Sequence, residues 1–203
     1  MITYVIIFVT VIVSITCFNN TVLFNKLSLF PYRVVKNKEW YRLLTHGFVH
    51  GDYMHLIINM LVFFSFGRYT EDYFKVLSQA DMIGNPAFCY LLLYFGGMVV
   101  ASIHDVVKNK NNPYYNSIGA SGAVSAVIFT TIFFDPWGKI YFFGFIPIPG
   151  LLFGALYLIY SQYMNKRGGG NVNHLAHFYG AVYGFIFPLL MNPSLIYQFL
   201  SNF

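Results

Sequence analysis

Charged side chains are scarce in this 203-residue sequence: Asp, Glu, Lys and Arg make up 9% of it, while 57% of the residues are hydrophobic. A soluble domain averages about 25% charged residues. So few charges cannot cover a water-exposed surface, which excludes a soluble globular protein and indicates a polytopic membrane protein. The net charge of +5 fits loops near anionic lipid headgroups. No basic, aromatic-interleaved surface pattern predicts a nucleic-acid partner.

Cysteine is also rare, with only Cys17 and Cys89, both in apolar runs. The sequence therefore predicts neither a disulfide framework nor a cysteine-based zinc site.

A histidine cluster, His46, His50 and His55, has the four- and five-residue spacing that metal ligands on a helix can have. However, no HExxH motif occurs, and Gly47 and Gly51 argue against one rigid helix through the first two. We therefore expect no metal and no cofactor. His46 and His50 are expected to support the loop that enters the second apolar segment.

Apolar runs divide the chain into six expected membrane spans, which would use about 120 residues and leave no room for a second folded domain. The spans are expected at 2–18, from 55 past 66, 88–107, 119–134, 140–164 and 174–191, the fifth bent at its start by Pro147 and Pro149. The first run lacks a basic flank and a clear cleavage site, and is interpreted as a retained span. We predict an all-α membrane bundle forming a single domain, 1–203.

Two connections stand out. The first loop, 19–53, mixes aromatic and basic side chains, which is typical of a segment lying in the membrane interface. The run "NKRGGGN" at 165–171 predicts a flexible loop, which would serve as a lid over a site at the start of the sixth span. The polar stretch 68–85 follows the second span, and the tail after 191 is too short for a further domain.

Polar side chains open three of the six spans. They are His55 with Asn59 in "HLIIN", Ser121 in "GASG" and His177 in "AHFYGAVYG". Alternating spans place these three starts on the same membrane face. The helix rise places each of the three residues roughly 18–21 Å from the far end of its span. Because the hydrocarbon core of a bilayer is about 30 Å thick, all three are expected on the order of 10 Å below the near surface. Polar groups at such positions are costly and indicate function.

Small residues predict close approach of the fourth and sixth spans. They are Gly119 and Gly122 on the fourth span and the pair Gly180 and Gly184 on the sixth. Close approach would bring the Ser121 hydroxyl within hydrogen-bond reach of the His177 ring.

The chemistry that this pair predicts is that of a serine hydrolase. Ser121 is the candidate nucleophile and His177 the base that activates it. No carboxylate lies near His177 in the sequence, which favours a Ser-His dyad over a triad. His55 and Asn59 project from one helical face, and with the Ser121 amide they are candidate donors to an oxyanion. Each motif alone is weak, since GxSG is a common tetrapeptide and GxxxG is mostly a packing motif.

Together the motifs resemble those of the rhomboid family of intramembrane serine proteases. "WYRLLTHGFVHGDYMHLIIN" is similar to the family's first-loop and second-span motif, "GASG" to its nucleophile motif and "AHFYGAVYG" to its histidine motif. The resemblance covers about 19–191 and looks like the minimal six-span bacterial form. It implies an endopeptidase that cuts transmembrane proteins without a cofactor, located as a multi-pass protein in a bacterial inner membrane. It also implies nucleophile Ser121, base His177 and an oxyanion hole of His55, Asn59 and the Ser121 amide.

The sequence departs from the family's pattern at two places. The family's first-loop Trp-Arg signature reads Tyr41-Arg42 here, with Trp40 one place earlier, so the resemblance implies that Trp40, Tyr41 and Arg42 support the first loop. Ser125 stands where some members carry an aromatic residue that packs on the catalytic histidine. His177 must therefore be oriented by another group, such as a tyrosine elsewhere in the chain.

Three alternatives remain at the level of sequence. An inactive rhomboid-like protein that binds transmembrane helices would keep the fold without the reaction. A small transporter would need inverted repeats, and none is visible. The third alternative concerns orientation, because the family's active site opens away from the cytoplasm. In this chain the loops on the active-site face hold nine Lys and Arg residues, and those on the other face hold three. By the positive-inside rule, this difference would place the active site on the cytoplasmic side. We follow the family, because an interface-bound first loop is exempt from that rule.

Overall fold

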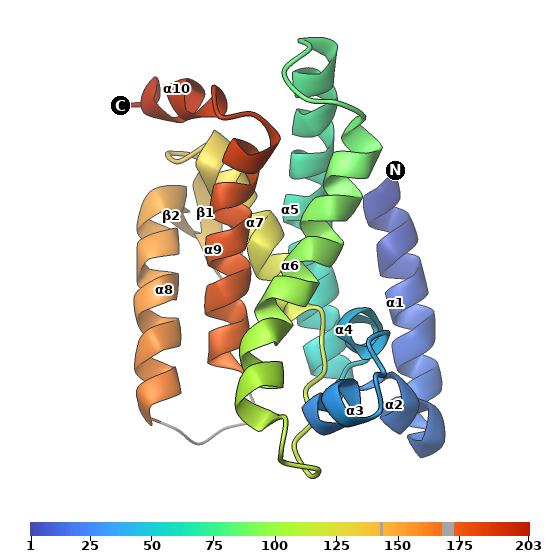
Figure 1. The fold of residues 1–203 in the computed structure, drawn as a ribbon. Coiled ribbons are helices and arrows are strands. Elements are labelled where there is room, and N and C mark those ends of the chain that lie inside the picture. The colour runs from blue at the N-terminus through green and yellow to red at the C-terminus, as the bar shows by residue number, and fades with distance from the viewer. Residues whose placement is uncertain (143, 168–172) are drawn as a thin grey trace.

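The computed structural model describes residues 1–142, 144–167 and 173–203. Two long helices, α5 and α6, and two medium ones, α8 and α9, stand around the short helix α7, and a third medium helix, α1, packs against α5 (Figure 1). Short helices and one β-hairpin connect them. The elements are α1 Ile2–Phe18, α2 Thr21–Leu27, α3 Pro31–Lys36, α4 Arg42–Thr45, the 3₁₀ helix η1 His46–Phe48, α5 Tyr53–Gln79, α6 Pro86–Asn109, α7 Ser121–Phe134, β1 Lys139–Phe142, β2 Ile146–Pro149, α8 Gly150–Arg167, α9 His174–Met191 and α10 Leu195–Leu200.

Helix α7 is the centre of the bundle. Its 14 residues are about 21 Å long, and all but Ser121 and Thr131 are buried. It packs against α5, α6, α8 and α9. The helix ends where Asp135 precedes Pro136, since the residue before a proline is disfavoured in the helical region. A helix enclosed in this way can hold polar groups away from lipid.

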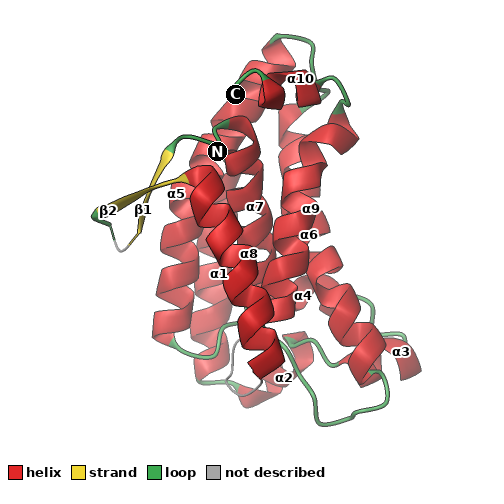
Figure 2. Cartoon of the chain, turned by 90° about the vertical axis from the view of Figure 1, so that its left-hand side faces the viewer, coloured by secondary structure: helices red, strands yellow, loops and turns green. Residues whose placement is uncertain are grey.

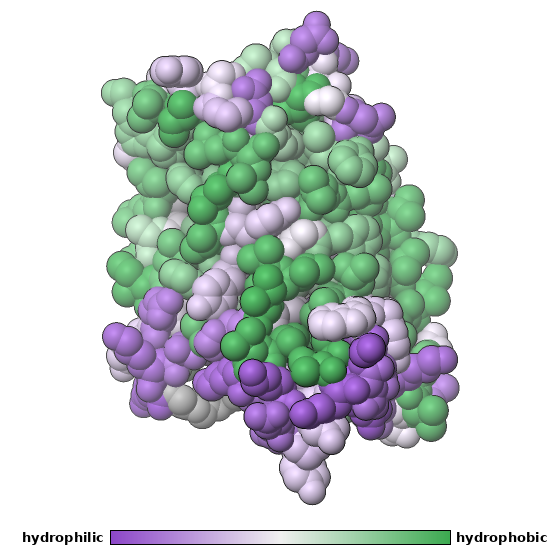
Figure 3. All heavy atoms as spheres, in the orientation of Figure 1, coloured by the Kyte–Doolittle hydropathy of each residue, from purple (hydrophilic) through white to green (hydrophobic). Residues whose placement is uncertain are grey.

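On the face shown in Figure 3, hydrophobic residues form a broad belt, and hydrophilic residues gather at the two ends. On α1 the exposed side chains include Val5, Phe8 and Ile12. By length and composition, α6 and α9 each qualify as a membrane span. Helix α5 qualifies together with the short helices at 42–48, and the chain bends by 99° between the two parts. Helices α1 and α7 are apolar but shorter. The belt and these helices identify an integral membrane protein.

The structure corrects the expected fifth span. The strands β1 and β2 pair antiparallel, with Tyr141 opposite Pro147, and the helix begins only at Gly150. Figure 2 shows the hairpin projecting from the side of the helices. Proline lacks the N–H that a helix needs, and the Ile-Pro alternation of β2 suits an edge strand. The fold is mostly helical, as predicted, but it is not purely α, and Pro147 and Pro149 lie in a strand and do not bend a helix.

Two other segments differ from expectation. Helix α5 continues through the polar stretch to Gln79, because that stretch contains good helix formers and no proline. The first loop, 19–53, contains α2, α3, α4 and η1. Of the predicted loop 165–171, residues 165–167 end α8 and the rest lie outside the described residues.

Helices α7 and α9 touch backbone to backbone. A Cβ atom added to Gly180 would overlap the carbonyl oxygen of Gly122, and one added to Gly184 would overlap that of Ala126. The Thr130 hydroxyl also donates to the Gly184 carbonyl, at 2.7 Å. The glycines set the separation of the two helices, in the way that small residues do in membrane bundles.

We therefore expect Gly184→Ala to destabilise the bundle, since the new methyl group meets backbone that cannot move aside. The cost should be about 3 kcal/mol, which corresponds to a fall in apparent Tm of roughly 5–10 °C. Thermal unfolding in detergent measures it. The matched control is Gly84→Ala, where an added Cβ meets no atom within 4 Å. Equal Tm values for the two variants would contradict this account of the packing.

Candidate active site

Ser121 is the first residue of α7, at the end of a tight turn. Gly119 has a φ of +107°, and a Cβ there would also lie 2.9 Å from a carbon of the His55 ring. Only glycine adopts such a backbone conformation easily. The Gly119 amide donates to the His46 carbonyl at 2.9 Å. Because Ser121 begins its helix, its own amide is one of the N–H groups that have no partner within the helix.

His177 lies in the first turn of α9 and faces Ser121. Its Nε2 is 2.8 Å from the Ser121 Oγ. When Nε2 is unprotonated, the hydroxyl donates to it, which is the arrangement in which a histidine can take the proton from a serine nucleophile. Among the described residues, no carboxylate hydrogen-bonds to the His177 ring. The structure thus brings together the two residues that the sequence proposed as a dyad.

The first turn of α9 is fixed by Asn173. This residue caps the helix, with its side-chain oxygen accepting from the Ala176 amide at 3.1 Å and its backbone carbonyl accepting from the His177 amide at 3.3 Å. The Asn173 side-chain amide donates to the Asp105 carboxylate. Asp105 is 4% exposed and lies near the end of α6. It connects α6 to the turn that carries His177.

Asp105 was missed as a site residue by sequence reasoning. A lone acid within an apolar helix is costly and hence a functional signal, but its partner Asn173 is 68 residues away. Only the fold joins them.

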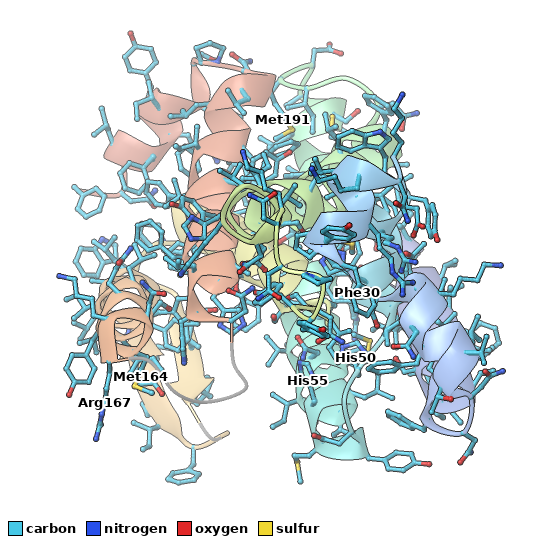
Figure 4. The ribbon with its side chains drawn as sticks, turned by 60° about the horizontal axis from the view of Figure 1, so that its bottom comes forward. Phe30, His50, His55, Met164, Arg167 and Met191 are labelled. Atoms are coloured by element: carbon cyan, nitrogen blue, oxygen red, sulfur yellow. The ribbon has the colours of Figure 1, made fainter. Side chains whose placement is uncertain are left out.

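His55 and Asn59, the other expected oxyanion donors, lie at the start of α5. The His55 ring is beside Gly119, two residues before Ser121, and contacts the His50 ring edge-on with centroids 4.9 Å apart (Figure 4). The Asn59 amide donates to the His55 carbonyl one turn back, at 2.9 Å, which leaves its second N–H for another acceptor. The structure therefore places His55 close to the turn and has Asn59 bonded within its own helix.

A small cavity of about 20 Å³ lies behind Ser121, enough for about one water molecule. Polar side chains in its lining include His46, Ser102, Asp105 and Asn173, beside apolar residues such as Met98. A water needs two to four polar partners, and this lining can supply them. The cavity therefore has the size and the polar lining to hold a water molecule beside Ser121.

The two histidines of the first loop, His46 and His50, hydrogen-bond to different partners. His46 Nδ1 pairs with the Arg42 carbonyl at 2.9 Å and its Nε2 with Ser102 Oγ at 3.2 Å. His50 Nδ1 pairs with Ser14 Oγ at 2.9 Å. Both residues tie the loop to neighbouring helices, and within residues 1–142, 144–167 and 173–203 no group of three metal-ligating side chains comes together.

Arg42 is the anchor of the first loop. Its side chain is 2% exposed, with Nε donating to Glu39 at 2.5 Å. Burial alone would raise the pKa of Glu39, but hydrogen bonds from Arg42 and Asn37 lower it. The Arg42 Nη1 also donates to three backbone carbonyls at the end of α2, those of Asn25, Lys26 and Ser28, at 2.8, 2.6 and 2.7 Å.

The other two residues expected to support the loop behave differently. The Tyr41 ring lies under the Arg42 guanidinium, 5.2 Å from ring centroid to Cζ. Trp40 is 57% exposed, so its ring does not pack beneath the loop.

The loop in turn holds the segment before Ser121. Leu29 and Ser117 exchange two backbone hydrogen bonds of 3.0 Å, four residues before the serine. With the bond from Gly119 to His46, they fix both ends of the 117–119 approach to α7. The position of the serine therefore depends on the first loop.

Comparison with known proteins identifies the family. The model of the rhomboid domain matches residues 37–194. The chain belongs to the rhomboid family. It is 29% identical over 153 residues to "RHOMBOID-like protein 12, mitochondrial" of Arabidopsis thaliana, and 26% over 156 residues to "Putative rhomboid protease YdcA" of Bacillus subtilis (strain 168). It is 31% identical over 166 residues to "RHOMBOID-like protein 4" of Arabidopsis thaliana.

The matches cover 72%, 77% and 79% of this chain, in that order. They cover 69% of the Bacillus relative but only 45% and 37% of the two plant relatives. This rhomboid chain therefore spans about half the length of the plant proteins or less. The region matched by the family model contains Arg42, His55, Asn59, Ser121 and His177.

The structure predicts that Arg42→Ala destabilises this rhomboid domain, because three carbonyls and Glu39 lose a buried charged partner. The cost should be about 3 kcal/mol. The ion pair with Glu39 contributes its full share of the stability above the ordinary pKa of glutamate. This share is lost as the pH falls through the lowered pKa that Glu39 has in the folded protein. Thermal unfolding from pH 7 to pH 3 measures both effects. The control is Lys36→Ala, at an exposed position of the same loop. If the Arg42→Ala and Lys36→Ala variants had the same Tm, the anchoring role of Arg42 would be contradicted.

Proposed function

We propose that this rhomboid protein is an intramembrane serine endopeptidase that cuts peptide bonds in or near transmembrane helices of other membrane proteins. The observation that carries the proposal is the 2.8 Å contact between Ser121 Oγ and His177 Nε2. It joins a hydroxyl and an imidazole at the adjacent starts of two helices whose backbones touch.

The reaction would run as acyl transfer through Ser121. The hydroxyl attacks the substrate carbonyl while His177 takes its proton, and His177 then protonates the leaving amine. Water, for which the cavity behind Ser121 offers room, would attack the acyl-enzyme with His177 again as base. Hydrolysis of the ester frees Ser121 and the second product.

The oxyanion formed in each step needs fixed donors. The free Ser121 amide at the start of α7 is one. His55, beside Gly119, and the second N–H of Asn59 are the others that we propose, and both would have to turn toward the oxyanion when substrate is bound.

The substrate would be a helix that unwinds locally, because a helical amide is already hydrogen-bonded. Segments that contain Gly or Pro lose least on unwinding, so they should be cut most readily.

We further propose that α1, α5, α6, α7, α8 and α9 form six spans, and that the protein resides in a bacterial inner membrane with the first loop and the dyad on the face away from the cytoplasm. An inactive rhomboid that only binds helices is the alternative. The direct contact of Ser121 and His177 favours the enzyme, since binding alone needs no base next to a serine.

Replacing either dyad residue should abolish cleavage. Ser121→Ala removes the nucleophile and His177→Ala the base, and each loss is worth on the order of 10⁶-fold in rate. Cleavage of a transmembrane substrate in liposomes measures it, with labelling by a serine-reactive fluorophosphonate as the second readout. Wild type should cut and label, and both variants should do neither. Cleavage retained by either variant would rule out the dyad.

Asn59→Ala tests the oxyanion donors. Loss of one donor should lower kcat by about 10²–10³-fold and leave KM unchanged, because the donor acts on the transition state. A Tm close to that of wild type separates this effect from misfolding, since Asn59 donates only within its own helix. A kcat equal to that of wild type would remove Asn59 from the oxyanion hole.

A further inference from the structure

One face of the His177 ring is covered by a side chain from a third helix. Tyr157 of α8 lies over the imidazole with ring centroids 6.2 Å apart and planes inclined by 23°. The dyad residues themselves lie on α7 and α9. Helix α8 therefore contributes to the surroundings of the site although it carries neither of them.

The Tyr157 hydroxyl reaches the other half of the dyad. It lies 2.6 Å from the Ser125 Oγ, and the Ser125 hydroxyl donates to the Ser121 carbonyl at 2.8 Å. A serine hydroxyl has one hydrogen, which Ser125 gives to that carbonyl. The Tyr157 hydroxyl must then donate to Ser125. Tyr157 thus contacts the base with its ring and, through Ser125, the backbone of the nucleophile.

The Tyr157 ring is itself held in place. Phe153 stacks on it with centroids 6.0 Å apart and an angle of 29°, and Phe129 of α7 lies 5.7 Å away. One turn before the tyrosine, Gly154 lets α8 approach α7, since a Cβ there would lie 3.3 Å from both Ile132 and Phe129. A ring fixed on several sides can fix its neighbour.

We propose that Tyr157 is a positioning residue for the proposed dyad: it holds the His177 ring in the plane that presents Nε2 to Ser121, and Ser125 holds Tyr157. This inference rests on the proposed protease function. The Tyr157 ring matters most, because it limits the rotation of the His177 imidazole. Among the described residues, no carboxylate bonds to that imidazole. The hydroxyl contributes less, by fixing the tilt of the tyrosine.

The experiment compares four single variants in the full chain with a transmembrane substrate in liposomes. Tyr157→Leu removes the ring, Tyr157→Phe removes only the hydroxyl, and Ser125→Ala removes its partner. Tyr163→Leu is the matched control, because this tyrosine lies on the same helix and is 59% exposed. For each variant, kcat, KM, fluorophosphonate labelling rate and Tm are measured, with rates normalised to folded protein.

Tyr157→Leu should lower kcat and the labelling rate on the order of 10²-fold, as expected for a misaligned catalytic group, with KM unchanged. Tyr157→Phe and Ser125→Ala should each cost about fivefold. Their double variant should cost no more than Ser125→Ala alone, because Ser125→Ala already removes the hydrogen bond to Tyr157. Tyr163→Leu should match wild type.

Three results would overturn the inference. They are a Tyr157→Leu variant as fast as the Tyr163→Leu control, a Tyr157→Phe variant as slow as Tyr157→Leu, and full additivity of Tyr157→Phe with Ser125→Ala. If Tyr157→Leu does not fold, the additivity of Tyr157→Phe with Ser125→Ala is the test of the inference. A wild-type protein that neither cuts nor labels would overturn the proposed function and this inference together, whereas the three results above leave the proposed function standing.

Discussion

The structure depends on the contact between the backbones of α7 and α9. Gly180 and Gly184 lie against the carbonyls of Gly122 and Ala126 with no room for a methyl group. In a membrane the hydrophobic effect does not drive helices together, so close packing must do so. The contact also sets the geometry of the proposed dyad. Because Ser121 and His177 stand in the first turns of these helices, the spacing of two backbones fixes a side-chain hydrogen bond of 2.8 Å.

Around this contact, the first loop serves as a scaffold for the turn before Ser121. The buried guanidinium of Arg42 gathers the carbonyls at the end of α2, and the residues that follow α2 pair with the approach to α7 through Leu29 and Ser117. A loop that lies at a membrane surface has to satisfy its backbone groups internally or with water. Here the same bonds that satisfy the loop also fix the turn at Gly119.

Much of the fold follows from the sequence, and the rest depends on tertiary contacts. Helix α9 begins and ends where the sequence predicts, at 174 and 191, because Asn173 caps it and Asn192-Pro193 stops it. The pairing of β1 with β2 was missed because an apolar run does not by itself distinguish strand from helix. Ser121 and His177 were identifiable because their motifs surround polar groups with glycine in apolar segments. Tyr157 and Asp105 were not, since a tyrosine among many and an acid near a helix end acquire a role only through partners brought in by folding.

In the proposed dyad, no carboxylate among the described residues bonds the His177 ring, which poses a problem of orientation that the rest of the fold can solve. In a triad, a carboxylate fixes the imidazole by bonding its second nitrogen. Here Asn173 fixes the backbone of His177 by capping α9, and Asp105 fixes Asn173 in turn. The ring still has to be held, and the stacked Tyr157 lies where it can do so. The backbone of the base would then be set from α6 and its ring from α8, so that a rigid dyad requires all the helices around α9 to be in place at once.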